Sequence, residues 1–465
     1  MRSVAFFLAL TLAGVSGADA RPDMTDQRPG STPLWTDNVD VLILVAPRGT
    51  PAYAAAQSRE NGSTVFAERK LWRALDRAAE LVNEGGSRTV AVLIAEGDYD
   101  GEFGAGIQRI PRLDNPDAAL RIFGGMTADF QGRQPFAHPV RIPTVHGRDG
   151  AIFQVEGRSK VRELVISGLI LDAAPSNEYD SRTNSLLKAS SRNYPVFAFA
   201  YCEIERLVIA DNVILNGASG GIQIGSTPPR GAGGEVIIQN NFILNNLLAL
   251  RTRTFGARTV AYDRLTVRHN TFALNFPYNP DPTSSNVAAV EWHNSNSFGE
   301  MVFEGNLFAY NPGGAFQSDW EQSDLPEITL RDNLFFTNGA LWGEGAPEAA
   351  VVAGKFGTHP TYRVLDLYDV EDDLDGAVSG NVTMDPQLPI AFSALQAANS
   401  GDVSAQVTVA NDVRRMFGIN TDGGTVAIAN FAPRMMFDVR ALPLPQNPEA
   451  QGYGVQPART WGAAN

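Results

Sequence analysis

Apolar and polar residues alternate two apart in short segments along most of the chain, which is the period of a β-strand. Between residues 207 and 338 this alternation belongs to a phrase that the sequence repeats five times. Each copy has apolar residues two apart, two polar or small residues, an Asn, a second apolar group and another Asn four or five residues later. The first Asn of each copy advances by 29, 29, 36 and 27 residues, through Asn212, Asn241, Asn270, Asn306 and Asn333. A repeated unit of this length indicates a solenoid in which each copy forms one coil.

The repeated Asn is expected to form a corner between two strands, because Asn is one of the few non-glycine residues that tolerate left-handed backbone angles. Stacked in register, Asn241 and Asn270 should be buried, with side chains bonded to backbone or to the neighbouring Asn. In an earlier coil, Leu169 takes the corner position. The second Asn of the five copies is Asn216, Asn245, Asn275, Asn311 and Asn338.

This phrase, followed by a strand such as Gly221–Gly225, resembles the repeat of right-handed parallel β-helix proteins of the pectate-lyase-like group. The early Gly124-Gly125 pair and the closing Gly380-Asn381 to Asp385-Pro386 phrase are also similar to that group. The resemblance implies an all-β fold, a right-handed parallel β-helix (solenoid) with an N-terminal capping helix and a C-terminal cap. It extends over residues 39–390 and is specific for the fold.

The start of the chain has the pattern of a secretory signal peptide over residues 1–20, with the apolar run Val4–Val15 followed by Ala18-Asp-Ala20. We therefore expect an exported protein, periplasmic or extracellular. Residues 21–88 predict a lead-in and then a capping helix at Thr64–Asn83, whose Leu71, Leu75, Ala78 and Val82 form one apolar face. Such a helix would cover the open end of the solenoid, where strand edges are otherwise bare.

The strand Val39–Ala46 precedes that helix, and Thr89–Ala95 is predicted as the first full coil. Residues 89–386 are assigned to the β-helix. Residues 387–465, with a helix at Val403–Phe417, are assigned to a C-terminal cap and a tail that runs along the solenoid. A separate small C-terminal domain is the alternative.

The net charge of −14 argues against nucleic acid or an anionic membrane as a partner. After the signal peptide no apolar run approaches membrane length, so no membrane span is expected. Cys202 is the single cysteine, which excludes an internal disulfide. The sequence does not indicate an oligomeric state.

Candidate chemistry lies on the strand that precedes each phrase, because one strand per coil lines a long outer face of such a solenoid. These strands are Phe197–Ile204, Gly221–Gly225, Leu248–Thr254, Val287–His293, Gly314–Trp320 and Ala349–Phe356. Residues two apart point to the same side, so Val290, Trp292 and Phe316 should point into the core. The outward column then holds Tyr201, Glu203, Gln223, Arg251, Arg253, Glu291, His293, Gln317, Asp319 and Lys355.

Arg253, His293 and Asp319 would then lie within about 10 Å, because neighbouring strands are about 4.8 Å apart. An Arg, an acid and a His are the groups that β-elimination from a uronic acid polymer requires. The Arg neutralises the sugar carboxylate, a base takes the neighbouring proton, and an acid serves the leaving oxygen. The candidate catalytic residues are Arg253, His293, Asp319 and Glu291, and the candidate substrate-binding residues are Arg251, Gln317, Tyr201 and Lys355.

The sequence therefore favours an exported protein that binds or cleaves an acidic polysaccharide or a cell-surface glycan, by lyase-type elimination if it is an enzyme. A non-catalytic surface, adhesion or structural module is the first alternative, because outward side chains of a solenoid must be polar in any case. A periplasmic accessory protein for metal-enzyme maturation is the second. No cofactor is expected. Calcium is the alternative at Glu371–Gly376, although Val382 stands where a calcium loop places a bidentate Glu.

Overall fold

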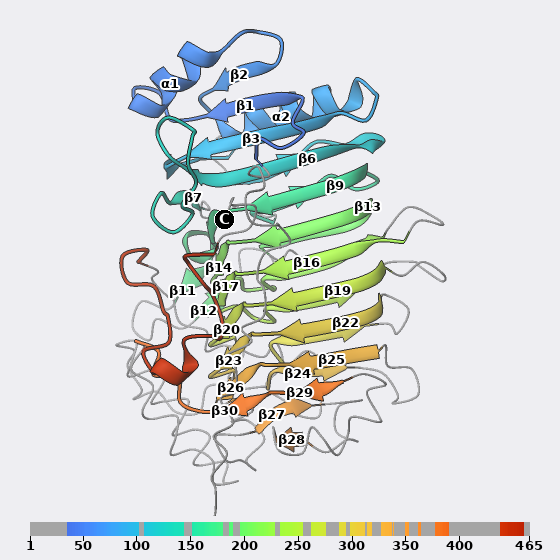
Figure 1. The fold of residues 1–465 in the computed structure, drawn as a ribbon, viewed down its shortest axis with the longest axis vertical. Helices are drawn as coiled ribbons and strands as arrows, with labels where there is room; N and C mark the ends of the chain where they lie inside the picture. Colours follow the sequence, from blue (N-terminus) through green and yellow to red (C-terminus); the bar gives the residue numbers. More distant parts are fainter. Residues whose placement is uncertain are drawn as a thin grey trace, which may run out of the picture.

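The protein, described by a computed structural model, consists mainly of strands stacked along one long axis (Figure 1). The structure describes residues 35–101, 107–143, 151–179, 186–188, 196–227, 233–253, 262–275, 288–293, 298–311, 314–318, 327–336, 338, 349–352, 361–363, 377–389 and 438–459. The predicted signal peptide, the helix predicted at Val403–Phe417 and the acidic loop at Glu371–Gly376 lie outside these residues.

The first of three faces is a parallel sheet that runs the length of the molecule. In spatial order it contains β2 (Val65–Glu68), β1 (Val41–Val45), β3 (Thr89–Ala95), β6 (Asp114–Met126), β9 (Lys160–Ser167), the second half of β13 (Phe197–Ala210), β16 (Glu235–Gln239), β19 (Tyr262–Arg268), β22 (Phe298–Glu304), β25 (Glu327–Arg331) and β29 (Val378–Ser379).

The second face holds the strands on which candidate chemistry was predicted. It contains β5 (Gln108–Ile110), β8 (Phe153–Val155), the first half of β13, β15 (Ile222–Thr227), β18 (Leu250–Arg253), β21 (Val290–His293) and β24 (Phe316–Ser318). The strand β13 bends from the second face into the first, so the two faces form one 17-stranded sheet.

The third face is a separate 9-stranded parallel sheet. It contains β4 (Gly97–Asp98), β7 (Val140–Pro143), β10 (Leu169–Asp172), β14 (Val213–Leu215), β17 (Phe242–Leu244), β20 (Thr271–Ala273), β23 (Leu307–Ala309), β26 (Leu334–Phe336) and β30 (Val382–Thr383).

In the central coils the chain visits the second, first and third faces in turn, and each strand pairs in parallel with its equivalent one coil earlier. This arrangement is compatible with a parallel β-helix. Two antiparallel pairs lie outside it: β11 (Glu178–Tyr179) with β12 (Leu186–Lys188), and β27 (Ala349–Val352) with β28 (Thr361–Arg363). Within the strand predicted at Ala349–Phe356, β27 lies against β24 of the second face, and it also pairs antiparallel with β28, a strand that the sequence pattern did not reveal.

The N-terminal region extends the first face by two strands. The chain runs from β1 through α1 (Pro51–Arg59) to β2, and from there through α2 (Leu71–Asn83) to β3. Parallel neighbours need such crossover connections. The predicted helix at Thr64–Asn83 is correct from Leu71 onward, but residues 65–68 form β2 because they pair with β1. Thr89–Ala95 forms β3, the third strand of this face in chain order and the first that is followed by a strand of the third face, β4.

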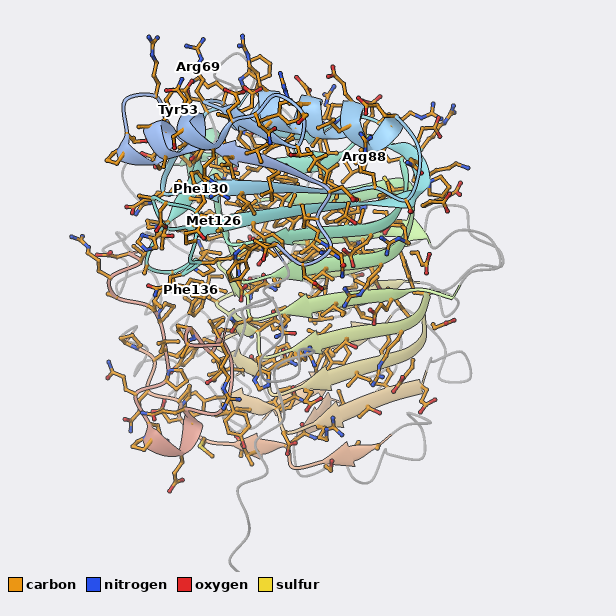
Figure 2. The ribbon with its side chains drawn as sticks, turned by 45° about the horizontal axis from the view of Figure 1, so that its top comes forward. Tyr53, Arg69, Arg88, Met126, Phe130 and Phe136 are labelled. Atoms are coloured by element: carbon orange, nitrogen blue, oxygen red, sulfur yellow. The ribbon has the colours of Figure 1, made fainter. Side chains whose placement is uncertain are left out.

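The two helices cover opposite sides of the N-terminal end (Figure 2). Leu71, Leu75, Ala78 and Val82 of α2 are buried in the main core, as their spacing predicts. Ala52 and Ala56 of α1 pack on the outer side with Phe130 and Met126. Because β3 is covered on both sides, all of its residues are buried.

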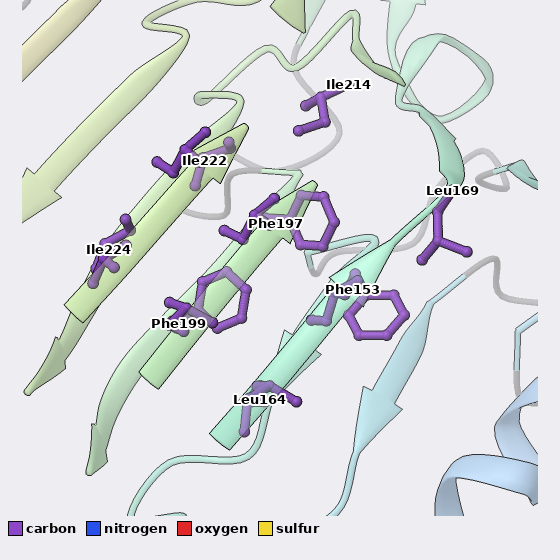
Figure 3. Packing of buried hydrophobic residues seen from close by; sticks show 14 of the residues in the cluster. Phe153, Leu164, Leu169, Phe197, Phe199, Ile214, Ile222 and Ile224 are labelled. Carbon is purple, nitrogen blue, oxygen red and sulfur yellow. The ribbon is translucent and has the colours of Figure 1, made fainter. Parts of the chain in front are cut away.

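Side chains from the three faces form one continuous apolar core (Figure 3). The second face contributes Phe153, Phe197 and Phe199, the third contributes Leu169 and Ile214, and aromatic rings stack from coil to coil. One such stack is Phe272, Phe308 and Phe335, with centroids 4.7 and 5.3 Å apart.

The outer side of the third face is also apolar, and residues 438–459 lie against it (the red segment in Figure 1). Ala450, in the 3₁₀ turn Pro448–Ala450, and Val455 are fully or almost fully buried there. The backbone N–H of Val455 donates to Thr271 Oγ1 at 3.1 Å, and that of Gln456 donates to Asn240 Oδ1 at 2.6 Å. We call residues 438–459 the C-terminal segment.

The repeated Asn residues form a ladder, as predicted. Each Nδ2 donates to the Oδ1 of the next member at 2.9 to 3.1 Å, and each of these Oδ1 atoms also accepts a backbone N–H, along Asn212, Asn241, Asn270, Asn306, Asn333 and Asn381. Leu169 precedes the ladder in register and donates its N–H to Asn212 Oδ1 at 3.0 Å.

A second ladder, for which no prediction was made, contains the second Asn of the last three copies but the residue after it in the first two. It runs through Asn246, Asn275, Asn311 and Asn338, and Gly217 donates its N–H to Asn246. Asn216 and Asn245, the second Asn of the first two copies, bond to each other one position earlier.

The left-handed corner was also assigned to the wrong residue. Positive φ occurs at the position before each Asn of the first ladder, which is Asp211, Asn240, His269, Gly305, Asp332 and Gly380. The ladder Asn therefore contributes hydrogen bonds, and its neighbour contributes the turn.

Candidate functional site

The outward column of the second face is defined by strand register. Gln223 of β15 is paired with Arg251 of β18, Arg251 with Glu291 of β21, and Glu291 with Gln317 of β24. Arg253 is paired with His293 two residues further along the same strands. In the intervening positions Val290 and Phe316 are buried in the core, as the alternation predicts.

Arg251 and Glu291 form the centre of this column. Arg251 Nε lies 3.6 Å from Glu291 Oε2, and the Arg side chain is 24% exposed while the Glu side chain is 0% exposed. The expectation that Glu291 lies on an exposed face is thus wrong. Alternation determines the side of the sheet to which a residue points, but neighbouring chain decides whether it reaches solvent. The two groups are within ion-pair distance, and the carboxylate is shielded from solvent.

Several predicted site residues are only partly described. The backbones of Arg253, His293 and Gln317 lie in β18, β21 and β24, but the arrangement of their side chains lies outside what the structure describes, as does that of Trp292. Asp319 and Lys355 lie outside the described residues altogether. The proposed distance between Arg253, His293 and Asp319 therefore remains a prediction.

Tyr201 is not in the column of Arg251. The strand β13 has a break in register between Ala200 and Glu203, and Tyr201 adopts a left-handed φ of 59° within it. This break explains why Phe197 and Phe199 point inward although they have the same parity as the outward Tyr201. Tyr201 and Glu203 consequently lie at the corner between the second and first faces, where Glu203 pairs with Lys160 at 3.1 Å.

The register also adds residues that sequence reasoning missed. Arg109 of β5 pairs with Gln154 of β8, Gln154 with Ala198 of β13, and Ala198 with Gln223. The column therefore continues toward the N-terminal end with an exposed Arg and a half-buried Gln. The repeated phrase, which marked the other strands, is absent from these early coils, so it could not identify them.

The first face carries charges that are neutralised within the sheet. Glu163 accepts from Arg121 Nε at 2.6 Å and from Arg206 Nη1 at 3.1 Å, and Arg206 also contacts Glu235. Burial by itself would raise the pKa of Glu163, but the two guanidinium groups lower that pKa below its usual value. Arg264 pairs with Glu300 at 3.2 Å further along. Because these Arg and Glu side chains pair with one another, the first face offers little net charge to a ligand.

Within the described part of the chain no three His, Cys, Asp or Glu side chains are grouped as metal ligands would be. Burial raises the pKa of the Cys202 thiol to about 12, which makes this residue an unreactive member of the core. No helix in the described ranges is both long and apolar enough to cross a membrane.

Comparison with known proteins gives little further information. No protein-family model and no curated protein matches the chain. Among solved structures, the chain is similar to that of Escherichia coli YbhC, at 10% sequence identity, over 77% of this chain and 88% of that chain, with a TM-score of 0.38. A similarity at this TM-score supports no argument about activity or ligand.

Proposed function

We propose that this protein is an exported, right-handed parallel β-helix whose second face binds an acidic polysaccharide. In this proposal α2 and the C-terminal region cap the ends of the solenoid. The observation that carries the binding proposal is the register of Gln223, Arg251, Glu291 and Gln317, with Arg253 beside His293. Strand pairing brings the backbones of these residues into adjacent coils, and in this proposal their amides, guanidinium groups and imidazole face the ligand together.

Arg251 is the best supported contact for a sugar carboxylate. A guanidinium presents paired N–H donors that match the two oxygens of a carboxylate. Glu291 lies beneath Arg251, so that it orients the guanidinium without competing for ligand in solvent. The role proposed for Glu291 is accordingly that of a positioning residue, in place of the catalytic role expected from the sequence.

The catalytic version of the proposal is β-elimination. Arg253 would pair with the carboxylate, His293 would remove the proton from the adjacent carbon, and Asp319 would protonate the departing glycosidic oxygen as the C=C bond forms. A neutral imidazole is suited to the base step.

Binding is tested with purified protein and a panel of soluble polyuronates at low ionic strength. The double variant Arg251→Gln/Glu291→Gln removes both charges of the pair, so no carboxylate is left buried beside a missing partner. We expect its melting temperature to stay near that of the wild type and its Kd to rise roughly tenfold or more, because a charge-assisted hydrogen bond contributes about 1.5–3 kcal/mol.

Arg69→Ala is the matched control, because Arg69 is an exposed arginine at the N-terminal end of the molecule (Figure 2). Its Kd should equal that of the wild type. The proposal fails if the wild type binds no polyuronate, and the site lies elsewhere if the double variant binds as tightly as the wild type. Release of ultraviolet-absorbing unsaturated products, abolished by His293→Ala, would establish the catalytic version.

A further inference from the structure

Tyr201 and Arg158 occupy equivalent turns in successive coils. The turn at residues 156–159 joins β8 to β9, and the bend of β13 at Tyr201 makes the same passage from the second face to the first. The backbone N–H of Arg158 donates to the carbonyl of Tyr201 at 2.9 Å. Both residues have left-handed backbones, with φ of 66° and 59°. The two residues are therefore stacked neighbours at one corner of the solenoid.

Tyr201 combines a left-handed backbone with an exposed side chain. Four other large apolar residues in the described chain have positive φ, namely Phe130, Leu248, Leu274 and Tyr310, and each is at most 5% exposed. Their burial offsets the unfavourable backbone. Tyr201 is 61% exposed, so burial offsets little of its strain. Strain that packing does not compensate is a reason to look for function at that position.

Arg158 provides a charge at the same corner. It is exposed, and no carboxylate of the described residues lies within ion-pair distance of it. By contrast, the nearby Lys160 is neutralised by Glu203. The corner thus presents the ring of Tyr201 and the guanidinium of Arg158, which forms no such ion pair with a described carboxylate.

We propose that Tyr201 and Arg158 form a second subsite for an acidic polysaccharide, an inference that rests on the proposed function of the second face. The apolar face of a sugar ring would lie on Tyr201, which combines an apolar ring with a polar hydroxyl. The carboxylate of the same uronic acid residue would pair with Arg158.

The position of the corner relative to Arg251 determines the length of ligand required. Ala198 lies two coils from Arg251 in the same column, and Tyr201 follows Ala198 by three residues. At about 4.8 Å per coil and 3.3 Å per residue, the separation is about 14 Å. One sugar cannot contact both positions, whereas a polymer can. Engaging both would strengthen binding of the polymer alone.

Glycine variants separate this role from folding. Glycine adopts positive φ freely, so Tyr201→Gly and Arg158→Gly remove the side chains and relieve the backbone at the same time. We expect both variants to melt at or above the wild-type temperature. Their Kd for a long polyuronate should rise about tenfold, while the Kd for a single uronic acid that reaches only Arg251 stays unchanged. Tyr201→Phe should retain polymer binding, and Arg69→Ala serves as the control.

The outcomes distinguish this inference from the function on which it rests. If the polymer binds Tyr201→Gly and Arg158→Gly as tightly as the wild type, but not Arg251→Gln/Glu291→Gln, the second subsite is refuted and the proposed function stands. A lower melting temperature in Tyr201→Gly would assign Tyr201 a structural role and overturn the inference. If the wild type binds no polyuronate at all, both proposals fall.

Discussion

At each coil corner one residue makes the hydrogen bonds and the residue before it makes the left-handed turn. The ladder Asn satisfies backbone groups of two coils, and the residue before it adopts the left-handed turn. The turn residues stack in a column of their own, which is tightly packed at Gly305. A Cβ on Gly305 would come within 2.5 Å of the His269 ring. The turn position accepts Asp, Asn, His or Gly, whereas every described coil from Asn212 to Asn381 has Asn in the ladder.

Replacing Asn241 by Leu should lower the free energy of unfolding by at least about 2 kcal/mol. The change removes the acceptor for the N–H of Asn212 and the donor for the carbonyl of Ile209, and each buried group left unpaired costs about 1–3 kcal/mol. Chemical denaturation measures the loss. Gln57→Leu, at an exposed position of α1, is the control, and equal unfolding energies for Asn241→Leu and the wild type would contradict the ladder.

Replacing His269 by Asn should make stability less sensitive to acid. Burial first, and then the charges of Arg268 and Arg459, lower the pKa of His269 from 6.5 to about 3. As pH falls below 6.5, His269 binds a proton in the unfolded chain but stays neutral in the folded chain. The unfolding free energy therefore falls by up to about 1.4 kcal/mol per pH unit until pH nears 3.

Asn fits the left-handed position of residue 269, since Asn240 occupies the same position one coil earlier. Unfolding free energies measured between pH 4.5 and 6.5 should fall more steeply for the wild type than for His269→Asn. Equal slopes in this window would show that His269 can be protonated in the folded protein.

At the scale of elements, covering segments determine what the sheets expose. The C-terminal segment packs on the apolar outer side of the third face and bonds to Thr271 and Asn240 in two different coils. Its few apolar side chains seal a surface that would otherwise be open to solvent.

Replacing Val455 by Asp should detach the C-terminal segment while the coils stay folded. Val455 is 1% exposed, so an aspartate there would be an unpaired buried charge. We expect rapid proteolytic cleavage within residues 438–459, stronger binding of an apolar dye and retained β-sheet circular dichroism. Gln451→Asp, at an exposed position, should behave like the wild type. Resistance of Val455→Asp to protease would indicate that the segment is held by other contacts.

For the molecule as a whole, the N-terminal region extends one end of the first face and covers it. Residues 41–83 supply β1 and β2, which extend the sheet beyond β3, and the helices that cover both of its sides. The outer edge of β2 is itself partly occupied, because Val65 N–H donates to Asn61 Oδ1 at 2.9 Å.

Deleting residues 21–88 should cause aggregation. The deletion bares the edge of β3 and both of its apolar sides, and unpaired edges template pairing between chains. Light scattering of the purified protein measures the effect, with deletion of residues 21–34 as the control that keeps every described element. A monomeric 21–88 deletion would refute the capping role.

The sequence by itself determined the arrangement of strands and ladder residues within each coil. The spacing of Asn212, Asn241, Asn270, Asn306 and Asn333 and the alternation around it predicted parallel strands, a buried ladder and the inward position of Val290 and Phe316, because these depend on local period alone. Only the tertiary structure decided which Asn joins the second ladder, where β13 breaks its alternation at Tyr201, and that Glu291 is buried. Those outcomes depend on contacts between segments far apart in sequence, where one backbone turn reverses parity and neighbouring chain decides exposure.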